Sequence, residues 1–358
     1  MISAKCYTQE WIEKKSQELG CHDKNLIEKV IHALSLLDML AQSGCPFHFK
    51  GGTSLMLILG EATNRLSIDI DIMCPPGTRI EDYLNDLSQS GFIRYEMVER
   101  QQAGKNVPKS HSKFFYQVAY KGAKNEESFI LLDVLYEDCH YVQVKEIEIE
   151  SPFVETEGDK RLVRVPSEGD ILGDKLTAFA PETTGVPYVK NGKSSSMEII
   201  KQLYDIGRLF DKVNDLTVTA QSFKNIGEIE LGYRGLPIDT SVIYDDIRNT
   251  ALNISTRGFF DKDKFAMLQD GINRFKPFIY NASYYIENAI VDAAKAAYLA
   301  TLLQHGVVHV EKYAGEPVST IDMSNVGEWP NKLNKLKKMN PEAFFYWTKA
   351  FSVECQQK

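Results

Sequence analysis

Apolar residues in the first half of the chain recur with two different spacings, one typical of helices and one typical of strands. Between residues 8 and 43 apolar side chains recur every three or four positions, which predicts two amphipathic helices. Gly44 and Pro46 end the second of them. Beyond this point short apolar runs and period-two alternation predict strands, with helices between some of them. We expect strands over 46–50, 67–74, 92–98, 113–121, 128–137 and 141–150, helices over 54–60 and 79–90, and a polar loop over 101–111.

From Pro166 onward the strand pattern largely stops and helical spacing takes over. The change predicts an α+β domain over residues 1–165, followed by a mainly helical domain over 166–358. A stretch rich in Gly, Pro, Lys and Ser, 181–195, is expected to link the first two helices of the second domain. These helices are expected over 168–180, 196–213, 217–231, 261–274, 281–305 and 341–355.

Two short motifs flank the helix expected over 54–60. Gly51 and Gly52 follow an apolar strand and expose backbone N–H groups at a helix start, where phosphate binds well. Asp69 and Asp71 lie two residues apart on the next strand, so their carboxylates share one face. Two like charges held this close repel one another unless a cation lies between them. Together the motifs predict a metal-dependent nucleotidyl or phosphoryl transfer site.

Gly-Gly alone is usually a turn, and Asp-x-Asp alone usually lies on a solvated strand edge or in a turn. The occurrence of both in this order, each beside an apolar strand, is what favours a transfer site. The sequence Gly-Gly-Thr-Ser (51–54), followed by Arg-Leu-Ser-Ile-Asp-Ile-Asp (65–71), resembles the first motif of the nucleotidyltransferase superfamily. In particular it resembles the AbiEii/AbiGii-type toxins of bacterial type IV toxin–antitoxin pairs. The resemblance implies a mixed sheet with flanking helices, Mg²⁺ at Asp69 and Asp71, and nucleotide contacts by Lys50, Gly51, Gly52, Thr53, Ser54, Arg65 and Ser67.

Two of these residues also fit ordinary structural roles. Arg65 could contact the triphosphate with its fork of donors, but it could equally pair with Glu61, four residues earlier. Lys50 could be a surface lysine at a strand end.

Asp133 is a single carboxylate within the apolar strand 129–135. An acid among apolar neighbours is costly unless it is paired or bound to metal. The alternative is an edge strand on which Asp133 faces solvent. The resemblance implies that Asp133 is the third carboxylate of the site and completes a second metal position.

Two charged residues of the helical region match later motifs of the family. Lys175 lies at the margin of an apolar helical stripe, so its stem can pack while the ammonium reaches an anion. By the resemblance, Lys175 neutralises a nucleotide phosphate, and Asp205 positions Lys175 or binds nucleotide. The alternatives are a surface lysine, and an ordinary helix-surface ion pair of Asp205 with Lys201 or Arg208.

Composition limits the partners and the location. The chain of 358 residues is long enough for two cores, and its net charge of -8 does not favour broad electrostatic binding of nucleic acid. The six cysteines are scattered without Cys-x-x-Cys spacing, and no signal peptide is evident. The most apolar stretch, 289–303, is too short to span a bilayer. We expect a cytoplasmic protein with reduced thiols and no membrane contact.

Aromatic residues at Tyr280, Tyr284, Tyr285 and 344–347, and the basic run 332–338, could contact RNA, although core packing is the preferred interpretation of the aromatics. We expect a Mg²⁺-dependent enzyme that moves NMP from an NTP to an acceptor hydroxyl. By the resemblance, relatives arrest growth as toxins, some extend the 3′ end of tRNA, and a cognate antitoxin often acts without a stable complex. The alternatives are a nucleotidyltransferase that modifies a protein or a small molecule such as an antibiotic, a non-catalytic nucleotide-binding regulatory protein, and a structural partner protein.

Overall fold

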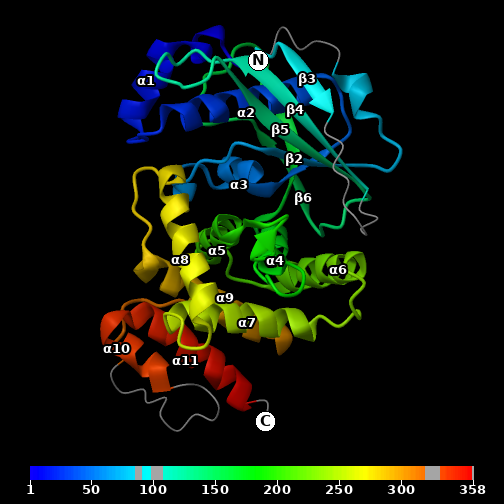
Figure 1. Ribbon diagram of the computed structural model, residues 1–358. Coiled ribbons are helices and arrows are strands. Elements are labelled where there is room, and N and C mark those ends of the chain that lie inside the picture. The colour runs from blue at the N-terminus through cyan, green and yellow to red at the C-terminus, as the bar shows by residue number, and fades with distance from the viewer. Residues whose placement is uncertain (85–90, 98–107, 319–330, 357–358) are drawn as a thin grey trace. The chain divides into compact units, whose positions relative to one another are not determined.

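The computed structural model describes residues 1–84, 91–97, 108–318 and 331–356. The chain forms two compact units (Figure 1). One comprises Met1–Ser167 with Pro277–Ser283, and the other comprises Glu168–Lys276 with Tyr284–Lys358. The expected fold class, α+β followed by a mainly helical region, is confirmed.

The first unit is built on a five-stranded mixed sheet with the order β1-β2-β5-β4-β3. β2 and β5 run parallel, and the other neighbouring strands are antiparallel. α2 packs against β2 and β5, and α3 packs against β1 and β2. A hairpin of β6 and β7 forms a second small sheet. The elements are η1 (Ala4–Tyr7), α1 (Gln9–Glu18), α2 (Lys24–Gln42), β1 (His48–Lys50), α3 (Gly51–Leu59), η2 (Gly60–Thr63), β2 (Ile70–Cys74), η3 (Ile80–Tyr83), β3 (Arg94–Met97), β4 (Lys109–Gln117), β5 (Glu127–Tyr136), β6 (Val144–Glu148) and β7 (Leu162–Pro166).

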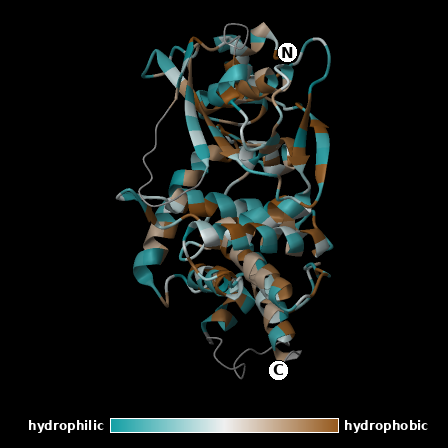
Figure 2. Ribbon diagram, turned by 90° about the vertical axis from the view of Figure 1, so that its right-hand side faces the viewer, coloured by the Kyte–Doolittle hydropathy of each residue, from teal (hydrophilic) through white to brown (hydrophobic). Residues whose placement is uncertain are grey.

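Side chains on one face of the central strands form the core, and several of the residues between them are polar. On β5, Ile130, Leu132 and Val134 are buried, while the residues between them are partly exposed. On the neighbouring strands Ile72 and Phe114 are buried in the same way. Hydrophobic and hydrophilic segments are interspersed along the ribbons in Figure 2. The apolar face builds the core, so the opposite face is available for chemistry.

The second unit is mainly helical in the part that the structure describes, with one short hairpin of β8 (Val189–Lys190) and β9 (Lys193–Ser194). α9 packs against α5, α7 and α11, and its buried alanines allow the neighbouring helices to approach closely. No helix among the described residues is long and apolar enough to cross a membrane. The helices are α4 (Glu168–Ala178), α5 (Ser196–Phe210), α6 (Thr217–Tyr233), α7 (Ser241–Ser255), α8 (Lys262–Phe275), α9 (Ile286–Gln304), η6 (Asn331–Lys335), α10 (Leu336–Met339) and α11 (Pro341–Gln356).

Several elements differ from the sequence-based expectations. The helix expected over 79–90 is wrong for its first part, where only the short η3 forms, and 85–90 lie outside the described residues. Of the loop expected over 101–111, residues 101–107 lie outside the described residues, and 109–111 are strand instead, because β4 begins at Lys109. α7 and β7 were not expected at all.

A segment that is distant in sequence completes the first unit. After η5 (Lys276–Phe278) the chain pairs with the stretch that precedes β2. The Leu66 N–H donates to the Phe278 carbonyl at 2.7 Å, and Arg65 and Ile279 form an isolated antiparallel bridge. Backbone pairing with residues 278–280 therefore holds the chain around Arg65, just before it enters β2.

Candidate active site

A row of polar side chains crosses the sheet of the first unit. Asp71 on β2 lies opposite Lys50 on β1 and opposite Asp133 on β5. Asp133 in turn lies opposite His111 on β4. Register partners on neighbouring strands point to the same face and lie about 5 Å apart. These four residues, which we term the carboxylate row, therefore place two acids side by side with a lysine at one end and a histidine at the other.

One hydroxyl group ties the two halves of the motif together, and a second closes the start of α3. The Thr53 hydroxyl donates to the backbone oxygen of Asp69 at 2.6 Å, and the Ser54 hydroxyl donates to the Gly51 carbonyl at 3.4 Å. Both side chains are fully buried. The Thr53 hydroxyl therefore holds the residue before β2 against α3, whereas the Ser54 hydroxyl closes a bond within the first turn of α3.

The diglycine at the start of α3 is required by the groups that pack against it. Gly51 has a φ of +77°, a conformation that favours glycine. A Cβ on Gly51 would overlap the Asp71 carboxylate. A Cβ on Gly52 would lie 2.5 Å from Arg65 Nη2 and 2.8 Å from Ser67 Oγ. The helix start, whose first N–H groups have no partner within the helix, therefore directly faces the side chains of the second half of the motif.

Arg65 is a buried residue of the site. Its side chain is almost fully enclosed, and Nη1 donates to the Leu66 carbonyl at 3.0 Å. Glu61 is exposed, so an ordinary surface pair between the two does not account for the burial of the guanidinium. A guanidinium beside a helix N-terminus adds donors for a phosphate group.

His111 was missed by the sequence-based reasoning. Its Nδ1 lies 2.6 Å from Asp133 Oδ1, and the exposed fraction is 9% for the His111 side chain and 34% for that of Asp133. The sequence placed His111 at the end of a loop. The signal that could have identified it is the alternation of β4, in which the buried Phe114 and Tyr116 define one face and His111 falls on the other.

Lys175 and Asp205 form an ion pair inside the second unit. Lys175 Nζ lies 3.0 Å from Asp205 Oδ2 and donates to Gln202 Oε1 at 3.0 Å. The exposed fraction of the Lys175 side chain is 8%, and Asp205 is fully buried. A charge pair enclosed to this degree is held in place by its partners rather than by solvent.

Three simpler interpretations of these residues do not hold. Asp133 is not on an edge strand, because β5 lies between β2 and β4. Lys175 is not a surface lysine. Asp205 is fully buried and therefore does not belong to a helix-surface ion pair.

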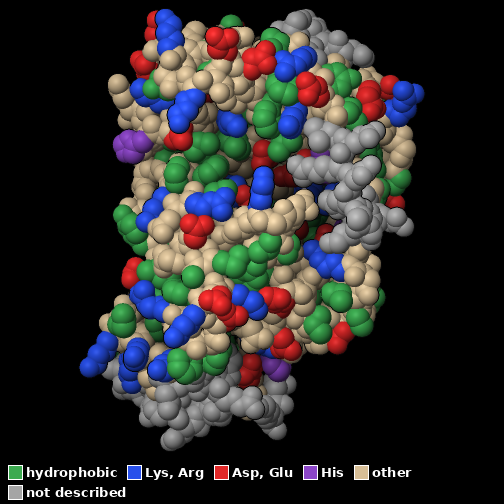
Figure 3. Space-filling model, in the orientation of Figure 1, with side chains coloured by type: hydrophobic (Ala, Val, Ile, Leu, Met, Phe, Trp, Pro, Cys, Tyr) green, Lys and Arg blue, Asp and Glu red, His purple; other side chains and the backbone are tan. Residues whose placement is uncertain are grey.

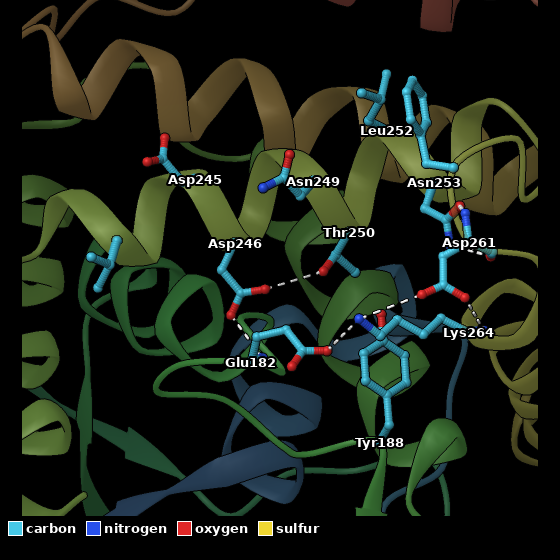
Figure 4. Close-up of a pocket in the computed structure, with 12 residues that line it drawn as sticks. Glu182, Tyr188, Asp245, Asp246, Asn249, Thr250, Leu252, Asn253, Asp261 and Lys264 are labelled. Carbon is cyan, nitrogen blue, oxygen red and sulfur yellow. Dashed lines mark hydrogen bonds and ion pairs between the residues drawn. The ribbon is translucent and has the colours of Figure 1, made fainter. Parts of the chain in front are cut away.

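A pocket of about 550 Å³ lies within the second unit, among α7, α8 and the segment that follows α4 (Figure 4). Its charged groups bind one another. Asp246 Oδ2 accepts the N–H groups of Glu182 and Thr183 at 2.8 Å, and Lys264 Nζ lies 2.9 Å from Glu182 and 3.5 Å from Asp261. Burial raises the pKa of Asp246 to about 6. These contacts hold the segment to the two helices, and we assign the pocket a structural role.

Comparison with known proteins defines the family. The family model described as nucleotidyl transferase AbiEii toxin of type IV toxin–antitoxin systems matches residues 35–305. The chain belongs to this family. The matched region contains the carboxylate row, the diglycine start of α3, and the Lys175–Asp205 pair. No curated protein matches the chain.

Two solved structures resemble this AbiEii-family chain only distantly. JHP933 from Helicobacter pylori has 13% sequence identity and a TM-score of 0.39, and the match covers 86% of this chain and 95% of JHP933. A protein from H. pylori described as a candidate nucleotidyltransferase has 14% identity and a TM-score of 0.40, and the match covers 78% of this chain and 94% of that one.

The donor set of the carboxylate row fits Mg²⁺. This ion is commonly held by one or two carboxylates together with phosphate oxygens of the substrate. Asp71 and Asp133 supply two carboxylates on one face of the sheet. The strand expected over 67–74 begins only at Ile70, so Asp69 lies just before β2 and not on the strand. Among the described residues no group of three or more His, Cys, Asp or Glu side chains is placed to hold a metal ion by itself. An ion at this row would therefore also need oxygens from the nucleotide.

The surface of the AbiEii-family chain carries mixed charge. On the face shown in Figure 3, basic and acidic side chains are interspersed.

The aromatic residues considered for RNA contact are mostly core, since Tyr280, Tyr284 and 344–347 are buried. The structure instead exposes Phe259 and Phe260. Their rings meet edge to face at a centroid distance of 5.1 Å, and Lys332 Nζ lies 4.4 Å from the Phe259 ring centroid.

Proposed function

We propose that this chain is a Mg²⁺-dependent nucleotidyltransferase that moves NMP from an NTP to an acceptor hydroxyl. The observation that carries the proposal is the pairing of Asp71 and Asp133 on one face of adjacent strands, with Asp71 packed against the glycine start of α3. Membership of the AbiEii family supports nucleotidyl transfer as the reaction class.

In this proposal the nucleotide phosphates bind at the start of α3. Backbone N–H groups of residues 51–54 and the Arg65 guanidinium donate to them, because a helix N-terminus and a fork of donors both favour anions. Lys50 lies at the end of the row, and Ser67 packs beside Gly52, where each can contact a phosphate. Thr53 and Ser54 contribute through their backbone, since their hydroxyls are buried.

Asp69, Asp71 and Asp133 would hold Mg²⁺, which when bound offsets the charge of the triphosphate and favours attack at the α-phosphorus. The acceptor oxygen forms a bond to this phosphorus, and the bond to pyrophosphate breaks. The proton of the acceptor hydroxyl passes to a carboxylate of the row, which we assign as Asp133.

The second unit supplies Lys175 and Asp205 to this scheme. We propose that Lys175 offsets charge on the phosphates as the transition state forms. Asp205 holds the ammonium group, consistent with the 3.0 Å separation and with the burial of both side chains. The assignment of these two residues to catalysis follows from the family motifs that they match.

The proposed acceptor is RNA, with the 3′ end of tRNA as the specific expectation. The toxin–antitoxin family supports a growth-arresting role in the cytoplasm, with a cognate antitoxin as partner. Phe259 and Phe260 favour RNA over a small molecule, because exposed rings beside Lys332 offer stacking surfaces and a charge for the phosphate backbone.

The test uses two labels. Purified protein is incubated with Mg²⁺, total cellular RNA and protein, and each NTP in turn, labelled with ³²P at either the α- or the γ-phosphate. Transfer of the α-label alone, with release of pyrophosphate and loss of transfer in D71N, is the expected result. Transfer of the γ-label alone would overturn the proposal in favour of phosphoryl transfer.

The fraction that carries the label identifies the acceptor. Label in RNA that is sensitive to ribonuclease supports the RNA acceptor. Label in protein or in a small molecule supports the alternative acceptors. Nucleotide binding without transfer of either label would favour a non-catalytic regulatory protein.

A further inference from the structure

The carboxylate row contains one residue that no motif assigns. We propose that His111 is a positioning residue, whose Nδ1–H holds Asp133 Oδ1 so that Asp133 Oδ2 is presented to a divalent cation beside Asp71. The inference rests on the proposed function, because it concerns how a carboxylate of that site is held.

The geometry supports a strong and specific contact. The separation of 2.6 Å between His111 Nδ1 and Asp133 Oδ1 is short for an N–H···O bond, as expected for a bond to an ionised acceptor. The two residues are direct register partners on antiparallel strands. Within the row, His111 lies on the side of Asp133 away from Asp71. A bond on that side engages one carboxylate oxygen and leaves the other for the side of β2.

The His111 side chain is almost fully enclosed, whereas the Asp133 carboxylate is partly exposed. The histidine is 7% exposed and lies on β4, which is paired with strands on both sides. Its neighbour Ser110 contacts the Tyr136 hydroxyl at 2.9 Å, which fixes the strand further. The Asp133 side chain is one-third exposed and would otherwise sample several rotamers. A donor enclosed in this way therefore favours one rotamer of the carboxylate before the cation binds.

A second histidine–carboxylate pair in the same unit provides a matched control. His140 Nε2 lies 2.7 Å from Glu137 Oε2, a separation close to that of the first pair. This pair follows β5 and is not part of the carboxylate row. A general effect of losing a histidine–carboxylate bond should appear in both pairs, whereas an effect on the cation should appear only at His111.

The experiment measures the affinity of the full-length protein for Mn²⁺ from the electron paramagnetic resonance signal of the free ion. H111F keeps an aromatic ring but removes the donor, and H111N restores an N–H near the position of Nδ1. We expect H111F to raise the Kd for Mn²⁺ about 10–100-fold, the usual effect of removing a group that orients a metal ligand. H111N should recover most of the affinity, and H140F should leave it unchanged.

A double-mutant cycle tests whether His111 acts through Asp133, and melting curves detect any loss of folding. If His111 acts through Asp133, H111F should have little further effect in the D133N background. An H111F variant that is folded and binds Mn²⁺ like the wild type would overturn the inference. The proposed function would still stand if the wild type transfers the α-label. A wild type that neither binds Mn²⁺ nor transfers label would instead refute the proposed function itself.

Discussion

The Lys175–Asp205 pair leads to a prediction about stability that can be separated from catalysis. D205A would leave the Lys175 ammonium enclosed without its carboxylate. Removing one partner of a buried pair typically costs about 3–5 kcal/mol, because the remaining charge has lost its solvent and its partner together. The same helix α5 offers a control. Lys201 Nζ also lies 3.0 Å from a carboxylate, that of Glu198, but the Glu198 side chain is 44% exposed.

The matched variant E198A should therefore cost less than about 1 kcal/mol, as is usual for exposed pairs. Urea unfolding followed by circular dichroism measures both changes in the free energy of unfolding. K175M/D205L removes both charges and should lie much closer to the wild type than D205A does, yet it should transfer no label if Lys175 acts on phosphate. Equal losses in D205A and E198A would refute the argument from burial. A double variant that is stable and fully active would refute the catalytic role.

Three further predictions concern other parts of the chain. G51A should abolish label transfer while the protein still folds, since the Cβ would displace the Asp71 carboxylate; retained activity would argue against this site. Because burial raises the folded-state pKa of Asp246 to about 6, the folded chain binds this proton more tightly than the unfolded chain. The wild type should therefore lose about 2.4 kcal/mol of unfolding free energy relative to D246N as the pH rises from about 4 to about 7, and equal pH profiles would contradict the assignment. F259A/F260A should weaken RNA binding in a filter assay without changing Mn²⁺ affinity, and unchanged binding would remove these rings from the acceptor site.

Local patterns predicted the glycine start of α3 and the strand that carries Asp71, because the rules behind both are local. A tight turn before a helix needs glycine, and residues two apart on a strand share a face. Both rules act within a few residues, so Gly51 and Asp71 could be assigned from the sequence. α7 was predictable too, because Ile243, Ile247 and Ala251 recur at helical spacing and are fully buried.

Other features depend on partners that are distant in sequence. The start of β4 is polar, and its strand conformation is stabilised by pairing with β5, so no local apolar pattern reveals it. The segment that pairs with Arg65 arrives from the end of α8, far along the chain. The Lys175–Asp205 contact joins two helices, each of which shows only a charge beside an apolar stripe. Sequence spacing identified these residues as candidates, but only the packing shows which groups they contact.

The carboxylate row shows how the core itself positions the site. Shifting the pairing of β2 and β5 by one residue would bring the Asp133 carboxylate to the wrong face relative to Asp71. Such a shift would also expose Leu132 and Val134, which are now buried opposite the polar face. At about 25 cal/mol per Å² of apolar surface, exposing several such side chains costs several kcal/mol, far more than two exposed acids repel one another in water. The register is therefore set by the apolar residues, and the two like charges remain side by side because the core holds them there.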